Sequence, residues 1–416
     1  MDWINTAKGA GSASGIPNDL ASDKAGNIYS VGYFESATID FDSTILRNNG
    51  QRDIFITKYN SNGDVLWAKS AGGGDDDEAK SVATDSEGNV FVAGYFNSSE
   101  VTFGDTQLSG SGTSKIFLAK YDPSGEHVWS TKIADGYVRV NSIAVDPRGN
   151  IVAALSYNDA MGLSPGFSLV KYGTDGSGIW SRGIGLFGSA NTGRECHVTT
   201  DWLGNIFLAG SFSSALYSDS IQLRAGGVGN MFIIKFDSGG NSQWGKTSTG
   251  SSADGATSIA TDPDGNVLVA GHCSESTIKF DSTTIAGGGG NFLTKYNTEG
   301  KVLWASGGHG PIYSIATDAS GQILMTGSFF SENSANDSFT TKYDENGHVS
   351  WVKIAAGTDE NVATAISVDP EGNVYVAGWF SRNITFGALE LTGSSDDIFM
   401  AKYNSNGDEQ WARIAR

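Results

Sequence analysis

The sequence lacks several features, and each absence excludes a class of protein. Cysteine is rare, with 2 residues in 416, so the chain has no disulfide framework. No apolar run approaches the roughly 18 residues that a membrane helix needs. No stretch of useful length repeats its apolar residues with the helical period of about 3.6. We therefore expect neither membrane insertion nor a helical fold.

Positive charge is also scarce. Lys and Arg number 27 against 46 Asp and Glu, which gives a formal net charge of −19. A protein that grips phosphate backbones nonspecifically needs a basic surface, so nucleic acid is not an expected partner. The residues Met1-Asp2-Trp3 carry neither the basic nor the apolar stretch of a secretory signal. We expect a mature or trimmed chain without a signal segment.

Glycine and aromatic residues are abundant, with 56 Gly, 10 Trp, 14 Tyr and 21 Phe. Many of the glycines belong to a repeated pattern, Asp-x-x-Gly-Asn, in which Gln322 is the one replacement of Asn. A fixed period is the signature of a repeat architecture. The spacings between successive copies run from 51 to 62 residues, and the copies begin at Asp23, Asp85, Asp146, Asp201, Asp262, Asp318 and Asp369.

A second pattern follows each copy of the first. A Lys precedes an aromatic residue, a Gly comes five residues after the Lys, and a Trp comes nine after it. The lysines are Lys58, Lys120, Lys171, Lys235, Lys295, Lys342 and Lys402. The tryptophans are Trp67, Trp129, Trp180, Trp244, Trp304, Trp351 and Trp411.

Each unit reads as four strands joined by tight turns. In the second unit, residues 81–85 alternate, residues 89–96 form a continuous apolar run, and residues 115–121 and 127–133 give two more strands. Four sequential antiparallel strands repeated seven times predict an all-β fold, a seven-bladed β-propeller, over residues 1–416 as a single domain. A further pattern such as Thr38-Ile-Asp-Phe41 predicts an added hairpin in several second-to-third strand connections, with short connections in units three and six.

The repeated string resembles that of a known family. Asp53-Ile-Phe-Ile-Thr-Lys-Tyr59 and Asp397-Ile-Phe-Met-Ala-Lys-Tyr403, with the Asp-x-x-Gly-Asn turns, are similar to the bacterial seven-bladed β-propeller repeats called SBBP. The resemblance covers all seven units, and unit three, with Leu155-Ser-Tyr157, departs from it most. It implies a bacterial surface or secreted protein, often a module of a longer chain. It carries no catalytic motif.

Sevenfold repetition favours a structural role for the repeated residues. We expect each Asp to accept backbone N–H bonds in its turn and to contact the repeated Lys. We expect the tryptophans to pack between blades. The segments Trp3–Lys8 and Trp411–Arg416 resemble each other, so we expect one of them to complete the seventh blade.

The variable segments lie on one face of the predicted disc. The turns that follow the repeated Asp and Lys are constant in length, whereas the connections between Trp and the next Asp, and between Asp and Lys, vary. Both variable connections emerge opposite the constant turns, and loops on a rigid scaffold commonly carry binding residues. The binding candidates there are Asp75, Asp76, Asp77, Glu78, Arg139, Arg194, Glu195, Asp254, His309, Tyr313, Asp359 and Glu360.

The acidic candidates leave a choice between a solvated loop and a Ca²⁺ site. Oxygen-rich loops hold Ca²⁺, but adjacent acids are more often solvated, so we expect no cofactor, with Ca²⁺ as the alternative. Cys196-His197 and His272-Cys273 leave three readings: a zinc site, a disulfide, or two unpaired buried thiols. Neighbours along a strand point to opposite faces, so all four side chains do not converge easily, and we favour the buried thiols.

Two functions remain open from the sequence. The first is a noncatalytic binding or scaffold module, extracellular or on a bacterial surface, that engages protein or glycan through the variable face as a monomeric part of a larger protein or assembly. The second is a lyase or hydrolase in the central funnel, which would need an acid/base pair among Arg139, Arg194, Glu195, His309 and Glu360. We expect no enzyme, because no catalytic constellation occurs at a telling spacing.

Overall fold

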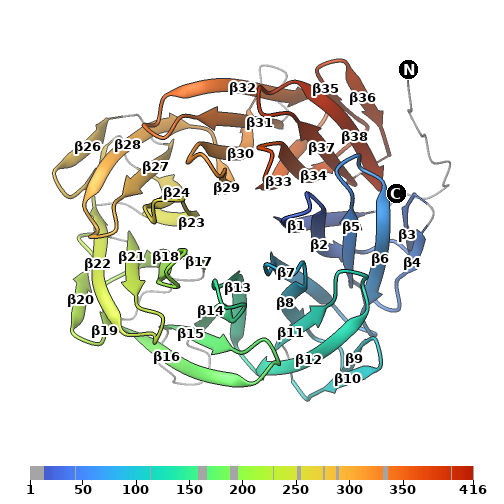
Figure 1. Ribbon diagram of the computed structural model, residues 1–416, viewed down its shortest axis with the longest axis horizontal. Coiled ribbons are helices and arrows are strands. Elements are labelled where there is room, and N and C mark those ends of the chain that lie inside the picture. The colour runs from blue at the N-terminus through green and yellow to red at the C-terminus, as the bar shows by residue number, and fades with distance from the viewer. Residues whose placement is uncertain are drawn as a thin grey trace.

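The computed structural model describes residues 14–42, 44–112, 114–157, 166–187, 195–227, 229–250, 254–274, 277–286, 290–330, 336–394 and 396–415. Regular structure in this part of the chain is entirely β. Seven antiparallel sheets surround a central axis, and each contributes four strands as one blade (Figure 1). The predicted seven-bladed β-propeller is confirmed.

The blades have the same strand order from the axis outward. The innermost strands are β1 (Gly15–Ser22), β7 (Asp77–Thr84), β13 (Val138–Val145), β17 (Cys196–Thr200), β23 (Asp254–Thr261), β29 (Ile312–Thr317) and β33 (Asn361–Val368). The second strands are β2 (Ile28–Phe34), β8 (Val90–Phe96), β14 (Ile151–Tyr157), β18 (Ile206–Phe212), β24 (Val267–Cys273), β30 (Ile323–Phe330) and β34 (Val374–Phe380). These second strands are almost wholly buried, as their continuous apolar runs predict.

The third and fourth strands complete each blade toward the rim. The third strands are β5 (Asp53–Tyr59), β11 (Lys115–Tyr121), β15 (Gly166–Tyr172), β21 (Asn230–Phe236), β27 (Gly290–Tyr296), β31 (Asn336–Tyr343) and β37 (Asp397–Tyr403). The outer strands are β6 (Val65–Ala71), β12 (His127–Ala134), β16 (Gly178–Phe187), β22 (Ser242–Thr249), β28 (Val302–His309), β32 (Val349–Ala356) and β38 (Glu409–Ala415).

Five blades carry an added hairpin at the rim. The pairs are β3 (Thr38–Phe41) with β4 (Thr44–Arg47), β9 (Glu100–Phe103) with β10 (Thr106–Ser109), β19 (Ala215–Ser218) with β20 (Ile221–Arg224), β25 (Thr277–Phe280) with β26 (Thr283–Ala286), and β35 (Asn383–Phe386) with β36 (Leu389–Thr392). Three of them also pair with the outer strand of the preceding blade, at β16–β19, β22–β25 and β32–β35. Among the described residues, blades 3 and 6 have no such hairpin, as the short connections predict.

The repeated Asp builds the turn between the two inner strands. In blade 1, Oδ1 of Asp23 accepts the N–H groups of Ala25 and Asn27 at 2.9 Å, and Oδ2 accepts the Asn27 side-chain amide at 2.7 Å. Gly26 has φ +76°, a conformation that suits glycine. All seven Asp residues accept the N–H four residues on, so the predicted turn chemistry is confirmed.

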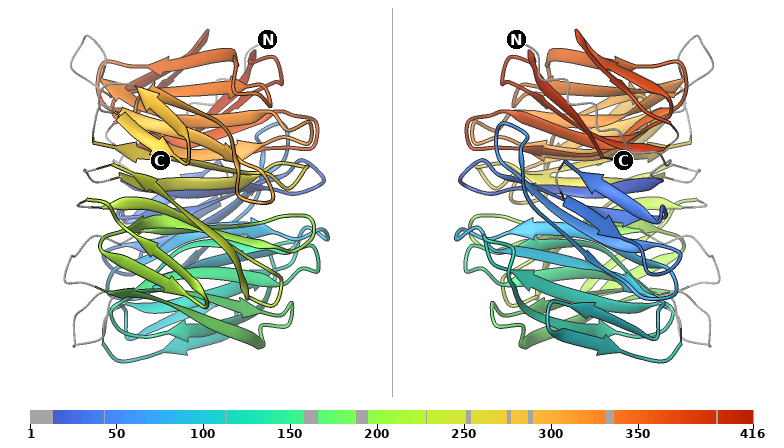
Figure 2. Two further views of the ribbon diagram at one scale, coloured as in Figure 1. Left: turned by 90° about the vertical axis from the view of Figure 1, so that its left-hand side faces the viewer. Right: turned by 90° about the vertical axis from the view of Figure 1, so that its right-hand side faces the viewer.

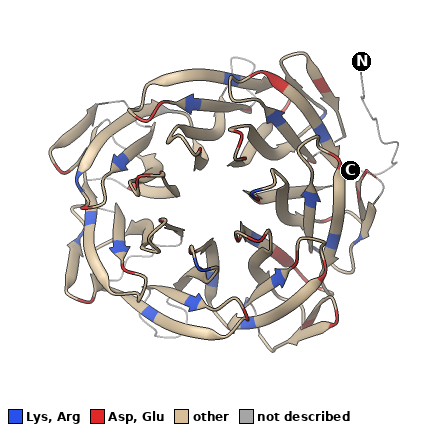
Figure 3. Cartoon of the chain, viewed as in Figure 1, with Lys and Arg blue, Asp and Glu red and all other residues tan. Residues whose placement is uncertain are grey.

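The repeated Lys and Trp join neighbouring blades. Lys–Asp ion pairs lie within blades 1, 3, 5 and 6, at 2.7 Å for Lys171–Asp146 and 2.8 Å for Lys295–Asp262. Every one of the seven lysines also donates to a backbone carbonyl in the next blade. In six junctions the indole N–H donates to that same carbonyl. Figure 3 shows these basic residues recurring around the ring.

The ring closes between blades 7 and 1 by the same contacts. The Trp411 indole N–H and Lys402 Nζ both donate to the Ser61 carbonyl, at 3.1 and 2.9 Å. Strand β38 pairs with β37 and is the outer strand of the seventh blade. The segment Trp411–Arg416 therefore fills the predicted closing position, apart from its last residue, and Trp3–Lys8 lies outside the described residues.

Candidate functional site

The two faces of the disc differ in how their polar groups are used. The turns built by the repeated Asp and Lys lie on one face, and the connections that vary in length lie on the other, which we call the loop face (Figure 2). On the turn face the Asp carboxylates are 2% to 9% exposed and already accept bonds within their turns. Because the repeated carboxylates already accept these bonds, they have little capacity left to bind a ligand.

Hydrogen bonds between neighbouring inner strands line the middle of the channel. Asp19 Oδ2 accepts the hydroxyl of Ser81 at 2.8 Å and the N–H of Val82 at 2.9 Å, both from blade 2. Ser81 Oγ in turn accepts the N–H of Ile143 in blade 3 at 3.1 Å. Burial raises the pKa of Asp19 to about 6. These groups connect blades, and their bonds leave them little capacity for a ligand.

The inner strands bulge toward the channel at one position. The pairing register of β1 shifts between Pro17 and Asp19, and five other inner strands shift at the equivalent place. A bulge leaves one residue out of the ladder and re-aims its side chain. The extra residues line a cavity of about 300 Å³ and differ in chemistry: Asn18, Lys80, Asn141, Thr257, Tyr313 and Thr364.

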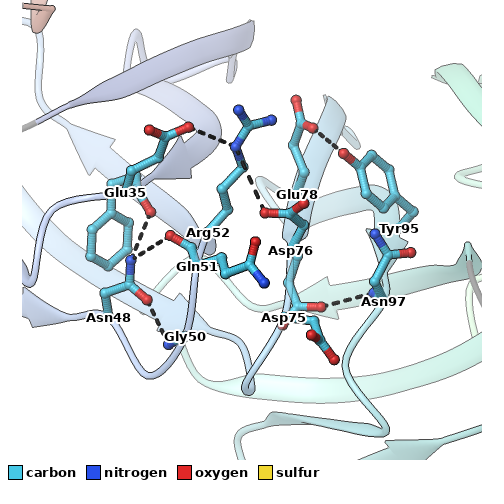
Figure 4. Close-up of polar contacts among 12 residues, drawn as sticks. Glu35, Asn48, Gly50, Gln51, Arg52, Asp75, Asp76, Glu78, Tyr95 and Asn97 are labelled. Atoms are coloured by element: carbon cyan, nitrogen blue, oxygen red, sulfur yellow. Dashed lines mark hydrogen bonds and ion pairs between the residues drawn. The ribbon is translucent and has the colours of Figure 1, made fainter.

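The densest group of charges lies on the loop face between blades 1 and 2. We call it the blade 1–2 cluster; it comprises Glu35, Arg52, Asp76, Glu78 and Tyr95, which Figure 4 labels, and Lys80, which pairs with Glu78. Arg52 Nε lies 2.7 Å from Glu35 Oε1 and 3.9 Å from Asp76 Oδ1. The Arg52 guanidinium also lies 4.5 Å from the centre of the Tyr33 ring. Arg52 therefore joins the connection before β5 in blade 1 to the start of blade 2.

Glu78 is the buried centre of this cluster. Its side chain is 3% exposed and accepts the Tyr95 hydroxyl at 2.5 Å and the Asn18 amide at 2.9 Å, and it also pairs with Lys80. Burial and the charge of Glu78 raise the pKa of the Tyr95 phenol. A phenol with a raised pKa is a poor nucleophile at neutral pH, so this arrangement suits binding better than covalent chemistry.

The four adjacent acids do not act as one group. The Asp75 side chain is exposed, whereas Asp77 is fully buried. Asp77 accepts the N–H of Gly73 at 2.7 Å and the Ser98 hydroxyl at 2.7 Å, so it holds the connection into blade 2. Among the described residues, no group of three or more His, Cys, Asp or Glu is placed to hold a metal ion.

The remaining acidic candidates are distributed over other blades. Asp254 is 2% exposed and accepts the Ser248 hydroxyl at 3.3 Å in blade 5. Asp359 lies 3.5 Å from Arg382 at the entry to blade 7, and its neighbour Glu360 is exposed. None of these three joins the blade 1–2 cluster.

The candidates for an acid/base pair are also separated. Arg139, Glu195 and Glu360 are exposed and belong to blades 3, 4 and 7, and within the described part of the chain no hydrogen bond or ion pair joins any two of them. Tyr313 is 42% exposed, lines the channel and contacts the Ser328 hydroxyl at 3.3 Å. His309 ends β28, and Arg194 lies outside the described residues.

The cysteine prediction is confirmed. Cys196 and Cys273 are both buried, belong to different blades and do not form a disulfide. Burial raises the pKa of Cys196 and lowers the pKa of His197, whose Nε2 is buried without a hydrogen-bond partner. A thiol with a raised pKa is inert, so these residues are part of the packing.

Sequence reasoning missed Arg52, Glu35, Lys80 and Tyr95. Glu35 and Arg52 flank strands of blade 1, whereas Lys80 and Tyr95 lie within β7 and β8 of blade 2. The packing of blade 1 against blade 2 brings them together. One signal was available: the residue five before the repeated Asp differs among the units, for example Asn18, Lys80 and Tyr313. In six of the seven blades that position is the bulge.

A further cavity opens on the turn face, where the turns have constant length in every unit. It measures about 580 Å³ and is lined by the tips of six of the seven inner turns. Trp202 at its edge is 63% exposed and Leu203 is 61% exposed, whereas the equivalent positions of blade 1 hold Lys24 and Ala25. None of the described residues forms a helix long and apolar enough to cross a membrane.

Two curated proteins are similar to parts of this chain. An uncharacterized WD repeat-containing protein of Acanthamoeba polyphaga mimivirus is 24% identical over 344 residues, covering 64% of this chain and 24% of that protein. The regulatory protein FlaEY of Caulobacter vibrioides is 28% identical over 158 residues, covering 37% of this chain and 16% of that protein. The matches thus span less than a quarter of either relative.

Solved structures share the fold. The acylaminoacyl peptidase of Pyrococcus horikoshii matches with a TM-score of 0.51 at 12% identity, over 96% of this chain and 52% of that one. The β-propeller domain of the Trilobed protease from Pyrococcus furiosus matches with a TM-score of 0.49 at 12% identity, over 94% and 98%. At these identities the likeness shows the fold alone.

A repeat family also matches. Residues 66–99, from the outer strand of blade 1 through the two inner strands of blade 2, match the family described as SBBP, β-propeller repeat. The match and the seven observed blades confirm the resemblance drawn from the sequence: the chain is a seven-bladed propeller that carries an SBBP repeat.

Proposed function

We propose that the chain is a noncatalytic binding or scaffold module, secreted or on a bacterial surface, that engages a protein or glycan through the loop face. The blade 1–2 cluster is the observation that carries this proposal. Arg52, Glu35 and Asp76 have side chains 36% to 40% exposed, so they present mixed charge to solvent on a rigid scaffold. Their supports, Glu78 and Asp77, are buried and hydrogen-bonded.

The chemistry of the cluster suits recognition of polar groups. Arg52 has guanidinium donors beyond its bond to Glu35, and Lys80, with a side chain 35% exposed, adds a second cation. Acceptors and donors alternate across the same surface, which fits sugar hydroxyls or the polar side chains of a protein. The raised pKa of Tyr95 and the separation of Arg139, Glu195 and Glu360 favour this function over a lyase or hydrolase.

A glycan array tests the proposal. The fluorescently labelled wild-type protein is compared with Arg52→Ala on the loop face and with Arg148→Ala, an equal loss of charge on the exposed turn face. We expect binding to fall at least tenfold in Arg52→Ala and to be kept in Arg148→Ala. Equal losses in both variants would contradict a loop-face site. A silent array directs the search to a protein partner, sought by crosslinking through the same loop face.

A further inference from the structure

The rim hairpins cover one face of the outer strands. The covered residues are the first and third after the repeated Trp. In blade 4, a Cβ added to Gly245 would lie 2.8 Å from Ile221 of the hairpin, and in blade 5 a Cβ on Gly307 would lie 2.5 Å from Ile285. In blade 7, Leu389 and Leu391 of β36 pack in one apolar cluster with Ala412 and Ile414 of β38. The hairpin is therefore an apolar cover for the outer strand of its own blade.

Blade 6 has apolar residues at these positions, and no hairpin among the residues that the structure describes covers them. The connection between β30 and β31 spans only residues 331–335, where the hairpin-bearing blade 7 has residues 381–396. Val352 and Ile354 occupy the first and third positions after Trp351 and are 52% and 53% exposed. Two half-exposed aliphatic side chains on one strand face form a contiguous apolar strip.

Blade 3 shows that an uncovered outer strand does not need such residues. It also has no hairpin of its own among the described residues, and its equivalent positions are Ser181 and Gly183. A Cβ added to Gly183 would meet nothing within 4 Å, so this face is open to solvent. The apolar pair is therefore a feature of blade 6 itself, because blade 3 also has no hairpin among its described residues and has no such pair.

The space between the outer strands β28 and β32 corresponds to the place that a hairpin occupies in other blades. In blades 4, 5 and 7 the hairpin pairs with the end of the outer strand of the preceding blade (Figure 1). The same hairpin packs against the outer strand of the blade to which it belongs. The corresponding end of β28 includes Gly308, where an added Cβ would meet nothing within 4 Å. Within the described residues, no strand pairs with the outer edge of β28.

We propose that the strip of Val352 and Ile354 on β32 is a docking surface for a β-hairpin of another protein, which presents aliphatic side chains on one face. Five hairpins of this chain occupy the equivalent place in their own blades, so the molecule itself displays the shape and chemistry of the occupant. Those five hairpins are already packed on their own blades, so a second copy of this chain has no free hairpin among its described residues. This surface lies on the rim and does not depend on the loop-face site.

The β35–β36 hairpin is the best internal template for a probe. Ile354 stands where blade 7 has Ile414, and Val352 stands where it has Ala412. A cyclic, fluorescently labelled peptide of residues Asn383–Thr392 is titrated with the whole protein, and binding is followed by fluorescence anisotropy. The variants are Val352→Ser with Ile354→Ser, which copy the polar character of blade 3, and the control is Val128→Ser, an equally exposed aliphatic of blade 2.

We expect saturable binding to the wild-type protein, at least tenfold weaker binding to the double variant, and unchanged binding to Val128→Ser. Circular dichroism checks that all three proteins melt at similar temperatures, which is expected because the substituted side chains are about half exposed. Failure of the wild-type protein to bind the peptide overturns the proposal. Equal binding by the double variant, or an equal loss in the control, overturns it as well, because the peptide would then contact another surface.

Discussion

At the scale of single residues, equivalent positions between blades hold different buried polar groups, and this difference changes their chemistry. Where the third strand of one blade meets the inner strand of the next, blades 6 and 7 place Asp337 opposite Asn361, whose amide donates at 3.4 Å. Blades 1 and 2 place two acids, Asp53 and Asp77, there, and both are fully buried. Oδ1 of Asp53 has no hydrogen-bond partner. Burial, with the charge of Asp77, raises the pKa of Asp53 to about 6.

Replacement of Asp53 by Asn is expected to change how stability depends on pH. With a pKa of about 6, the folded protein holds this proton between about pH 4 and 6, where the unfolded chain has released it. This carboxyl therefore contributes stability at low pH that is lost as the pH rises through about 6. We expect Asp53→Asn to gain about 1 to 3 kcal/mol relative to the wild-type protein between pH 4 and pH 7, measured by urea unfolding.

The exposed neighbour Asp75 gives the matched control for this experiment. Asp75→Asn removes the same charge from an exposed position in the connection into blade 2 and is expected to change the free energy of unfolding little. A constant difference between Asp53→Asn and the wild-type protein at every pH would mean that Asp53 does not titrate in this range.

At the scale of elements, the turn between the third and fourth strands of each blade contacts the preceding blade. Gly300 in blade 5 has φ +79°, and a Cβ there would lie 2.8 Å from the Trp244 ring of blade 4. The Thr298 carbonyl of this turn accepts two hydrogen bonds, from the Trp244 indole N–H at 2.9 Å and from Lys235 Nζ at 3.0 Å. The repeated Gly, Lys and Trp are thus one contact surface divided between two blades.

Trp244→Ala is expected to lower stability by about 3 to 5 kcal/mol, because the change removes a large packed ring and leaves a cavity between blades. Differential scanning calorimetry measures the loss of melting temperature. Trp202→Ala is the control, since that ring is 63% exposed and its removal should change the melting temperature little. An unchanged melting temperature in Trp244→Ala would contradict the packing role.

The sequence predicts elements far better than it predicts the contacts between them. The Asp-x-x-Gly-Asn and Lys-to-Trp patterns specify four strands and two turns in each unit, because the same local chemistry recurs seven times. The hairpins were also predicted, but their pairing with the preceding blade, as at Ala355 with Phe386, depends on geometry that no single unit contains. Only two of the six residues of the blade 1–2 cluster, Asp76 and Glu78, were found from the sequence for the same reason, because Arg52 and Tyr95 come from other parts of the two units.

At the scale of the whole molecule, the ring is stable only if its last junction resembles the others. Blade 7 is built entirely from residues 361–415, so no strand is exchanged between the two ends of the described chain. Closure then depends on packing and hydrogen bonds between blades 7 and 1, including one from the Gly15 N–H to the Asp396 carbonyl at 3.3 Å. Besides the Trp411 and Lys402 bonds to Ser61, the Ser22 hydroxyl donates to the Val368 carbonyl at 2.6 Å.

A comparison of two equivalent tryptophans tests whether the junction between blades 7 and 1 contributes as much to stability as another junction does. Trp351 joins blade 6 to blade 7, and Trp411 joins blade 7 to blade 1, each by an indole bond to a turn carbonyl, at 3.2 and 3.1 Å. Glycine stacks on both rings, Gly407 on Trp351 and Gly63 on Trp411. Because the contacts match, we expect Trp351→Ala and Trp411→Ala to lower the free energy of unfolding by similar amounts, about 3 to 5 kcal/mol each. If Trp411→Ala costs far less than Trp351→Ala in chemical unfolding, blades 7 and 1 separate in solution and the ring is open at that junction.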